Sequence, residues 1–175
     1  MRTSASRGSS TNKERSRRTL RSAQTDAIAL LKADHRQVET WFEQFEHARS
    51  ADRKQALATK ISNALKVHTE IEEEIFYPAF LASTKDADMH HEAVVEHAEA
   101  KKLIAEIEAS SPQDDYFDAK VKVLSEMIKH HVKEEEQPGG MFARARKSDM
   151  NMEQLGQELK ARKTQLEAQQ AHGAH

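Results

Sequence analysis

Residues 117–135 read FDAKVKVLSEMIKHHVKEE, and this stretch decides the fold. Its inward series alternates steps of four and three residues, which is the period of an α-helix with one buried face. His131 and Glu135 continue that series after the apolar residues. The stretch therefore predicts a helix that turns a histidine and a glutamate towards the interior of a helical protein.

Three further stretches repeat the helical period and complete a predicted bundle. One covers about residues 25–49, the next begins at Ser50, and the third follows a polar turn at residues 83–86. The fourth is the stretch quoted above, for which Pro112 is typical of a helix start. Connections this short make neighbouring helices antiparallel, so we predict an all-α, up-down-up-down four-helix bundle over residues 22–147.

Both ends of the chain differ from the bundle in composition. Residues 1–21 carry seven Arg or Lys against one Glu and show no apolar period. We interpret them as a disordered basic arm that could contact a protein or a nucleic acid. Residues 148–175 form a predicted C-terminal amphipathic helix and tail, expected to pack outside the bundle or against a partner. Its thin apolar stripe is Met152, Leu155, Leu159 and Leu166. The oligomeric state stays open.

Composition excludes several classes of protein. Hydrophobic residues make up 37% of the chain and charged residues 32%, which suits helices with one narrow buried face. No stretch is long and apolar enough for a transmembrane helix, so no membrane contact is expected. The absence of cysteine excludes disulfides and thiolate ligands and fits a cytoplasmic location. No phosphate-binding loop or nucleophile elbow supports nucleotide binding or hydrolysis.

Six polar residues share the predicted inward faces: His35, His68, Glu72, His97, His131 and Glu135. A carboxylate buried among apolar side chains costs on the order of several kcal/mol unless a cation compensates it. The inward stripes of the first, second and fourth helices contain no Lys or Arg, although Lys101 on the third could approach. Counted from the turns at about 1.5 Å per residue, the six lie within about 6 Å of one level. We therefore predict that they form one metal site.

The donor types restrict the metal. Structural zinc takes four ligands, commonly with thiolates, and calcium and magnesium avoid imidazole. Four imidazoles and two carboxylates suit two iron or manganese ions. Iron is the favoured prediction, and manganese or a single metal ion is the alternative.

Several short strings resemble the hemerythrin-like, or HHE cation-binding, family over about residues 24–146. They are Asp34-His35-Arg36, HTEIE at residues 68–72, IFYP at residues 75–78, Glu96-His97 and HVKEE at residues 131–135. The resemblance implies a non-haem di-iron centre with an oxo or hydroxo bridge. It also implies that Glu72 and Glu135 bridge the irons while the histidines cap them.

One position departs from the oxygen-carrying members of that family. They have a histidine four residues before the position of His97, where this chain has Ala93. Neither His90 nor His91 is placed to replace it, so one iron is expected to keep a position open to water, peroxide or a gas. The histidines outside the six are interpreted as solvent-facing. Tyr77 is interpreted as a packing residue, with an approach to the site as the alternative.

Two functions use the same six ligands. The preferred hypothesis is a module that binds or senses dioxygen, peroxide or nitric oxide in a stress or redox response. The alternative is a di-iron enzyme that removes peroxide in the manner of a catalase or peroxidase. A third hypothesis is a metal-independent adaptor that acts through residues 1–21 and the C-terminal helix.

Overall fold

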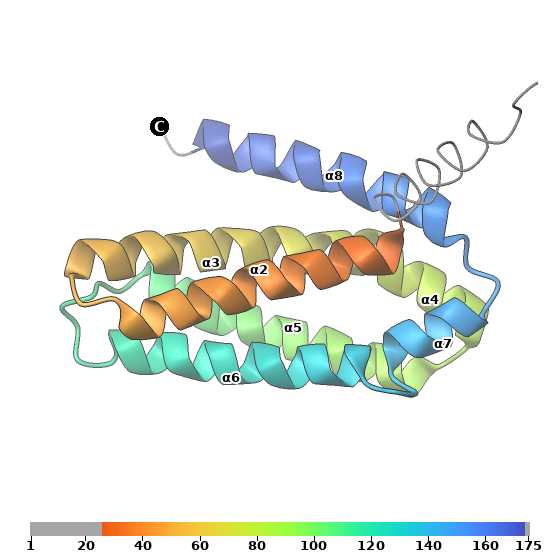
Figure 1. Ribbon diagram of the computed structural model, residues 1–175, viewed down its shortest axis with the longest axis horizontal. Coiled ribbons are helices and arrows are strands. Elements are labelled where there is room, and N and C mark those ends of the chain that lie inside the picture. Colours follow the sequence, from red (N-terminus) through yellow and green to blue (C-terminus); the bar gives the residue numbers. More distant parts are fainter. Residues whose placement is uncertain (1–25, 174–175) are drawn as a thin grey trace, which may run out of the picture.

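The computed structural model describes residues 26–173, and every regular element in this range is a helix (Figure 1). Helices α2, α3, α5 and α6 form a closed ring in which each packs against two neighbours, with its axis antiparallel to theirs. This confirms the predicted four-helix bundle. The elements are α2 (Ala27–His47), α3 (Ala51–Ile71), η1 (Glu72–Phe76), α4 (Tyr77–Thr84), α5 (Ala87–Glu108), α6 (Phe117–Glu136), α7 (Met141–Lys147) and α8 (Met152–Gly173).

Side-chain caps fix where three of these helices begin. The side chains of Asp26, Ser50 and Asp86 accept hydrogen bonds from backbone N–H groups in the first turns of α2, α3 and α5. The predicted start of the fourth helix near Pro112 is wrong, because α6 begins at Phe117. The Ser111 N–H donates to the Asp114 side chain at 2.8 Å. This local hydrogen bond holds the residues just before Phe117 in turns in place of a helix.

A π-helical turn, η1, joins α3 to α4. The backbone N–H of Tyr77 donates to the carbonyl of Glu72, five residues earlier, so the turn contains one residue more than an α-helical turn. The extra residue rotates everything that follows. Tyr77 and Phe80 are consequently buried, whereas Ala79, which the regular helical period placed inside, is only half-buried.

The apolar core is divided into two clusters along the bundle axis. One includes Val38, Leu65, Ile104 and Ile128, and the other includes Leu31, Ile71, Phe76 and Met141. The six predicted site residues occupy positions between these clusters on every helix of the bundle. The site is therefore a polar layer enclosed by apolar side chains from both directions.

Helix α7 closes one end of the bundle. Met141, Phe142 and Ala145 are buried there, and the ring of Phe142 stacks on that of His35 with 5.9 Å between ring centroids. The turn from α6 into α7 requires Gly140, because a Cβ at this position would lie 2.2 Å from the carbonyl oxygen of Glu134.

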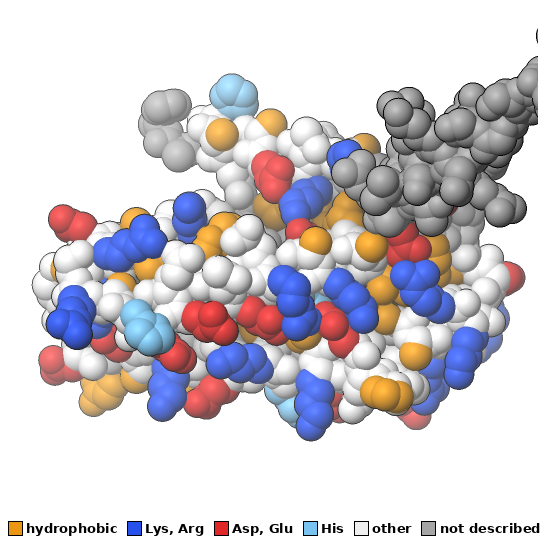
Figure 2. All heavy atoms as spheres, in the orientation of Figure 1, with side chains coloured by type: hydrophobic (Ala, Val, Ile, Leu, Met, Phe, Trp, Pro, Cys, Tyr) orange, Lys and Arg blue, Asp and Glu red, His pale blue; other side chains and the backbone are white. Residues whose placement is uncertain are grey.

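Helix α8 lies across the outside of α2 and α3 (Figure 1). Leu159 and Leu166 are its buried contacts, which confirms that the C-terminal helix packs outside the four-helix bundle. Figure 2 shows acidic and basic side chains interspersed over the face that carries α2, α3 and α6. Within residues 26–173, no helix is both long and apolar enough to cross a membrane. The arm predicted at residues 1–21 lies outside the described residues.

Candidate metal centre

Four imidazoles meet inside the bundle, one from each of α2, α3, α5 and α6. His35, His68, His97 and His131 are each at most 5% exposed. Their Nε2 atoms face inward in two pairs, with 3.0 Å between those of His35 and His68 and 3.2 Å between those of His97 and His131. Four nitrogen lone-pair positions therefore converge on one small volume.

Two carboxylates lie between the histidine pairs. Glu72 Oε2 is 3.2 Å from His68 Nε2 and 3.4 Å from His97 Nε2. Glu135 is 3.5 Å from His35 Nε2 through Oε2 and 3.6 Å from His131 Nε2 through Oε1. Each carboxylate thus contacts one histidine of each pair, and the fold brings all six predicted residues together.

Unpaired oxygen atoms show that these residues fit a bound cation. Glu72 Oε1 and Glu135 Oε2 are buried without a hydrogen-bond partner among the described residues, an arrangement that is costly unless another charge satisfies them. Within this cluster, two trios of ligand atoms, each within 4.8 Å of one another, could hold an ion. One trio is His35, His68 and Glu72, and the other is Glu72, His97 and His131. Because Glu72 belongs to both, the donor set fits two neighbouring ions.

Each imidazole also has a carboxylate facing its outer nitrogen, Nδ1. The distances from Nδ1 are 2.8 Å for His35 with Glu136, 3.5 Å for His68 with Asp34, 3.1 Å for His97 with Glu73 and 2.6 Å for His131 with Glu96. A carboxylate that accepts a hydrogen bond from Nδ1, as at His35, His97 and His131, holds the proton on that nitrogen and leaves Nε2 free to coordinate a metal. At His68 the carboxylate of Asp34 faces Nδ1 at ion-pair distance without a hydrogen bond.

These four acids form a regular pattern that sequence reasoning missed. Each is adjacent in the sequence to a candidate ligand of its own segment, as in Asp34-His35 and Glu96-His97, yet it supports the histidine of the next helix. An acid of α2 faces the histidine of α3, an acid of η1 that of α5, an acid of α5 that of α6, and an acid of α6 that of α2. An acid beside each ligand was the available signal, but its partner depends on how the helices pack.

Charge is shared unevenly within the cluster. Burial alone would lower the pKa of His68, but the negative charge of Glu72 and the facing Asp34 raise it to about 10. Burial would raise the pKa of Glu72, but the positive charge of His68 lowers it to about 2. Burial, reinforced by the negative charge of Glu72, raises the pKa of Glu135 to about 8. Cations bound between these groups would take the place of protons.

Tyr77 is buried and is also part of the cluster, so the alternative prediction that it approaches the site is confirmed. Its hydroxyl oxygen lies 3.1 Å from His97 Nε2 and 3.4 Å from His131 Nε2, and it donates to Glu135 at 3.1 Å. The π-helical turn causes this placement, because in a regular helix Tyr77 would point elsewhere. Burial raises the pKa of the phenol well above its ordinary value, with the charges of Glu135 and Glu72 acting in the same direction.

Ala93 is buried beside the cluster. It lines a cavity of about 90 Å³ together with Met89, His131, Glu135 and Met141. The ring of His90 lies 6.2 Å from that of Tyr77 and is half-buried, so the predicted solvent-facing position of His90 is wrong.

Comparison with known proteins accords with this geometry. Residues 26–138 match the hemerythrin HHE cation-binding domain, and this match covers more than half of the chain. The chain belongs to the hemerythrin HHE cation-binding domain family. All six candidate ligands lie within the matched residues, as do the four supporting acids and Tyr77. Helices α7 and α8 lie beyond them.

Two individual proteins resemble this family member. A protein from Nostoc sp. named a DNA nickase is 29% identical over 148 residues, which are 83% of this chain and 42% of the relative. The chain therefore spans less than half the length of that relative. The crystal structure of a hemerythrin HHE cation-binding domain-containing protein from Mycobacterium kansasii superimposes with a TM-score of 0.73. It is 19% identical, and the match covers 84% of this chain and 90% of that one, so it shows a shared fold.

Proposed function

We propose that the six residues bind two iron ions and that this centre binds dioxygen, hydrogen peroxide or nitric oxide in a stress or redox response. The position of Glu72, 3.2 Å from one histidine pair and 3.4 Å from the other, carries the proposal. A carboxylate placed in this way can bridge two cations. Glu135, which also contacts one histidine of each pair, can form a second bridge. Membership of a cation-binding family supports metal binding by the cluster.

The donor set supports iron. The chain has no cysteine, and hard oxygen-seeking ions such as calcium do not favour a set with four imidazoles. Imidazole nitrogens combined with carboxylate oxygens suit iron or manganese. Two bound iron ions would supply the electron transfer that dioxygen and peroxide chemistry needs.

Residues around the cluster support the entry of a small ligand. The cavity beside Ala93, at about 90 Å³, exceeds the roughly 10–15 Å³ that one water molecule needs. Its wall includes His131 and Glu135, so a molecule in it would lie directly against two candidate ligands. The apolar clusters on both sides of the layer limit access by bulk water.

Metal analysis of the purified protein tests the proposal. We expect close to two irons per chain and a visible absorption spectrum that changes on exposure to air or peroxide. Glu72→Ala should remove both irons, because both trios use this carboxylate. Glu126→Ala, which changes an exposed glutamate of α6, is the matched control and should keep them. Full iron content in Glu72→Ala would contradict the assignment.

Tyr77 favours peroxide removal as a second candidate function. Its hydroxyl lies 3.1 Å from Glu135 Oε1, within hydrogen-bonding reach of a peroxide held beside that residue, and it could supply a proton to the leaving oxygen while bound iron supplied the electrons. Dioxygen release from added hydrogen peroxide, measured with an oxygen electrode and proportional to iron content, would support the enzyme. A stable ligand complex without turnover would instead support binding or sensing.

The name of the Nostoc relative suggests a further assay. That protein is named a DNA nickase, and the basic residues 1–21 were interpreted as an arm that could contact a protein or a nucleic acid. Conversion of supercoiled plasmid to the open circular form, with and without iron, would show whether this chain nicks DNA. Salt-sensitive DNA binding that is lost on deletion of residues 1–21 would assign the contact to the arm.

A further inference from the structure

Three of the four acids that support the histidines are themselves held by a basic side chain of the bundle. Arg36 of α2 contacts Glu136 at 2.6 Å, and Lys101 of α5 contacts Glu73 at 2.7 Å. The His130 imidazole of α6 lies 3.6 Å from Glu96. Arg36, Lys101 and His130 all belong to the family-matched residues.

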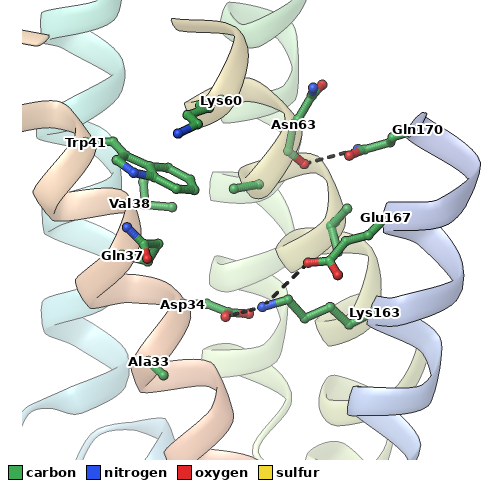
Figure 3. A pocket seen from close by; sticks show the side chains of 12 residues that line it. Ala33, Asp34, Gln37, Val38, Trp41, Lys60, Asn63, Lys163, Glu167 and Gln170 are labelled. Atoms are coloured by element: carbon green, nitrogen blue, oxygen red, sulfur yellow. Dashed lines mark hydrogen bonds and ion pairs between the residues drawn. The ribbon is translucent and has the colours of Figure 1, made fainter. Parts of the chain in front are cut away.

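Asp34, the acid that faces His68, is different. Its cation is Lys163 of α8, outside the family-matched residues, and Figure 3 shows the two side chains meeting between α2 and α8. Lys163 contacts Oδ1 of Asp34, while Oδ2 is buried and lies 3.5 Å from His68 Nδ1, an ion-pair distance at which neither atom has a hydrogen-bond partner among the described residues. Because the lysine engages one oxygen, it fixes the orientation in which the other oxygen faces His68.

Neighbouring contacts hold Lys163 at this place. Arg162 contacts Glu70 at 3.1 Å and Glu74 at 2.6 Å. In the sequence, these two acids lie two residues before and two residues after the candidate ligand Glu72. Further along α8, Gln170 donates to the carbonyl of Asn63 at 3.1 Å (Figure 3). The buried Leu159 and Leu166 add apolar contact with the bundle. Helix α8 is therefore attached along most of its length.

We propose that Lys163 is a positioning residue for the metal centre, acting through Asp34 on His68. By this arrangement α8 completes the trio of His35, His68 and Glu72, whereas the trio of Glu72, His97 and His131 is complete within the bundle. The inference rests on the proposed metal site and deepens it. It predicts that a change in α8 alters one metal-binding step and leaves the other unchanged.

Titration of the full chain with Co²⁺, followed by absorption spectroscopy, tests this proposal independently of the identity of the natural metal. Lys163→Met keeps the length of the side chain and removes its charge, and it should weaken one of two binding steps about three- to tenfold. Asp34→Asn should weaken the same step about tenfold or more, since mutation of such partners typically costs 10- to 100-fold in affinity. Lys163→Arg should restore binding.

Two controls separate positioning from general support of the fold. Lys160→Met changes an exposed lysine of the same helix, whereas the ion pairs of α8 with the described residues come from Arg162 and Lys163. It should leave both steps unchanged. In an Asp34→Asn background, Lys163→Met should have almost no further effect, because the two residues act through one path.

Other outcomes overturn the proposal. These are unchanged Co²⁺ binding in Lys163→Met, an equal loss in both steps, an additive loss in the double variant, or no Co²⁺ binding by the unmodified chain. The iron content of the unmodified protein reports separately on the proposed function, so failure of one is distinguishable from failure of the other.

Discussion

Glu96 Oε2 accepts a hydrogen bond from His131 Nδ1 at 2.6 Å, although the neighbour of Glu96 in the sequence is His97. The same offset recurs around the bundle, so each helix supports the histidine of the next one. Rotation or displacement of one helix would therefore disturb two histidines, namely the one it carries and the one it supports. This coupling ties the geometry of the cluster to the packing of all four helices.

Removing the negative charge of Glu96 beside His131 should weaken the binding of one metal ion. Glu96→Gln keeps the shape of the side chain but removes the charge at His131 Nδ1, and we expect affinity for one metal to fall about 10- to 100-fold. Competition titration with a chelator of known affinity measures it. Glu99→Gln, on an exposed position of the same helix, should have no effect. Equal affinity in the two variants would show that the short Glu96–His131 bond does not influence the site.

Tyr77→Phe should leave the metals bound and change the chemistry. The hydroxyl is lost, but the buried ring keeps its packing, and the loss of one hydrogen bond should cost about 1 kcal/mol of unfolding free energy. We expect close to two irons per chain and slower decay of hydrogen peroxide, measured in a stopped-flow spectrometer. A variant that consumes peroxide as fast as the unmodified protein would exclude Tyr77 as the proton donor.

Glu135→Gln tests whether the raised pKa of Glu135 makes the stability of the metal-free protein depend on pH. Burial and the charge of Glu72 raise the pKa of Glu135 from 4.5 to about 8. A raised folded-state pKa means that its contribution to stability is fully present below about pH 4.5 and is lost as the pH rises through about 8. In the presence of a chelator, the unmodified protein should lose about 1.4 kcal/mol per pH unit relative to Glu135→Gln across this window.

Urea unfolding at several pH values measures that difference. Glu126→Gln, at an exposed position of α6, serves as the control and should follow the unmodified protein. Parallel stability curves for Glu135→Gln and the unmodified protein would mean that Glu135 is ionised throughout, and that another group balances its charge.

Ala93→His should fill the space beside the cluster. Position 93 is 5% exposed and borders the cavity of about 90 Å³, so an imidazole placed there would compete with a small ligand. We expect slower reaction with peroxide and a longer-lived complex with dioxygen. Overpacking could cost about 1–3 kcal/mol, so folding is checked first by thermal melting. A folded variant that binds two irons and reacts as fast as the unmodified protein would place the open position elsewhere.

The sequence by itself determined the four bundle helices, the C-terminal helix and the six candidate ligands. The period of the apolar residues follows from the geometry of a single helix, and His131 and Glu135 could be placed on the inward face because they share that period. The level of the site could be estimated because each helical residue advances by a fixed distance. These properties depend on neighbours along the chain.

The tertiary structure alone decided the partners of those ligands. The π-helical turn at Glu72–Phe76 moved Tyr77 into the cluster, and a regular period could not indicate where an extra residue would be inserted. The pairing of Glu96 with His131 and of Lys163 with Asp34 joins residues from different helices. Such pairs depend on the rotation and displacement of whole helices against one another, which packing of the complete core fixes.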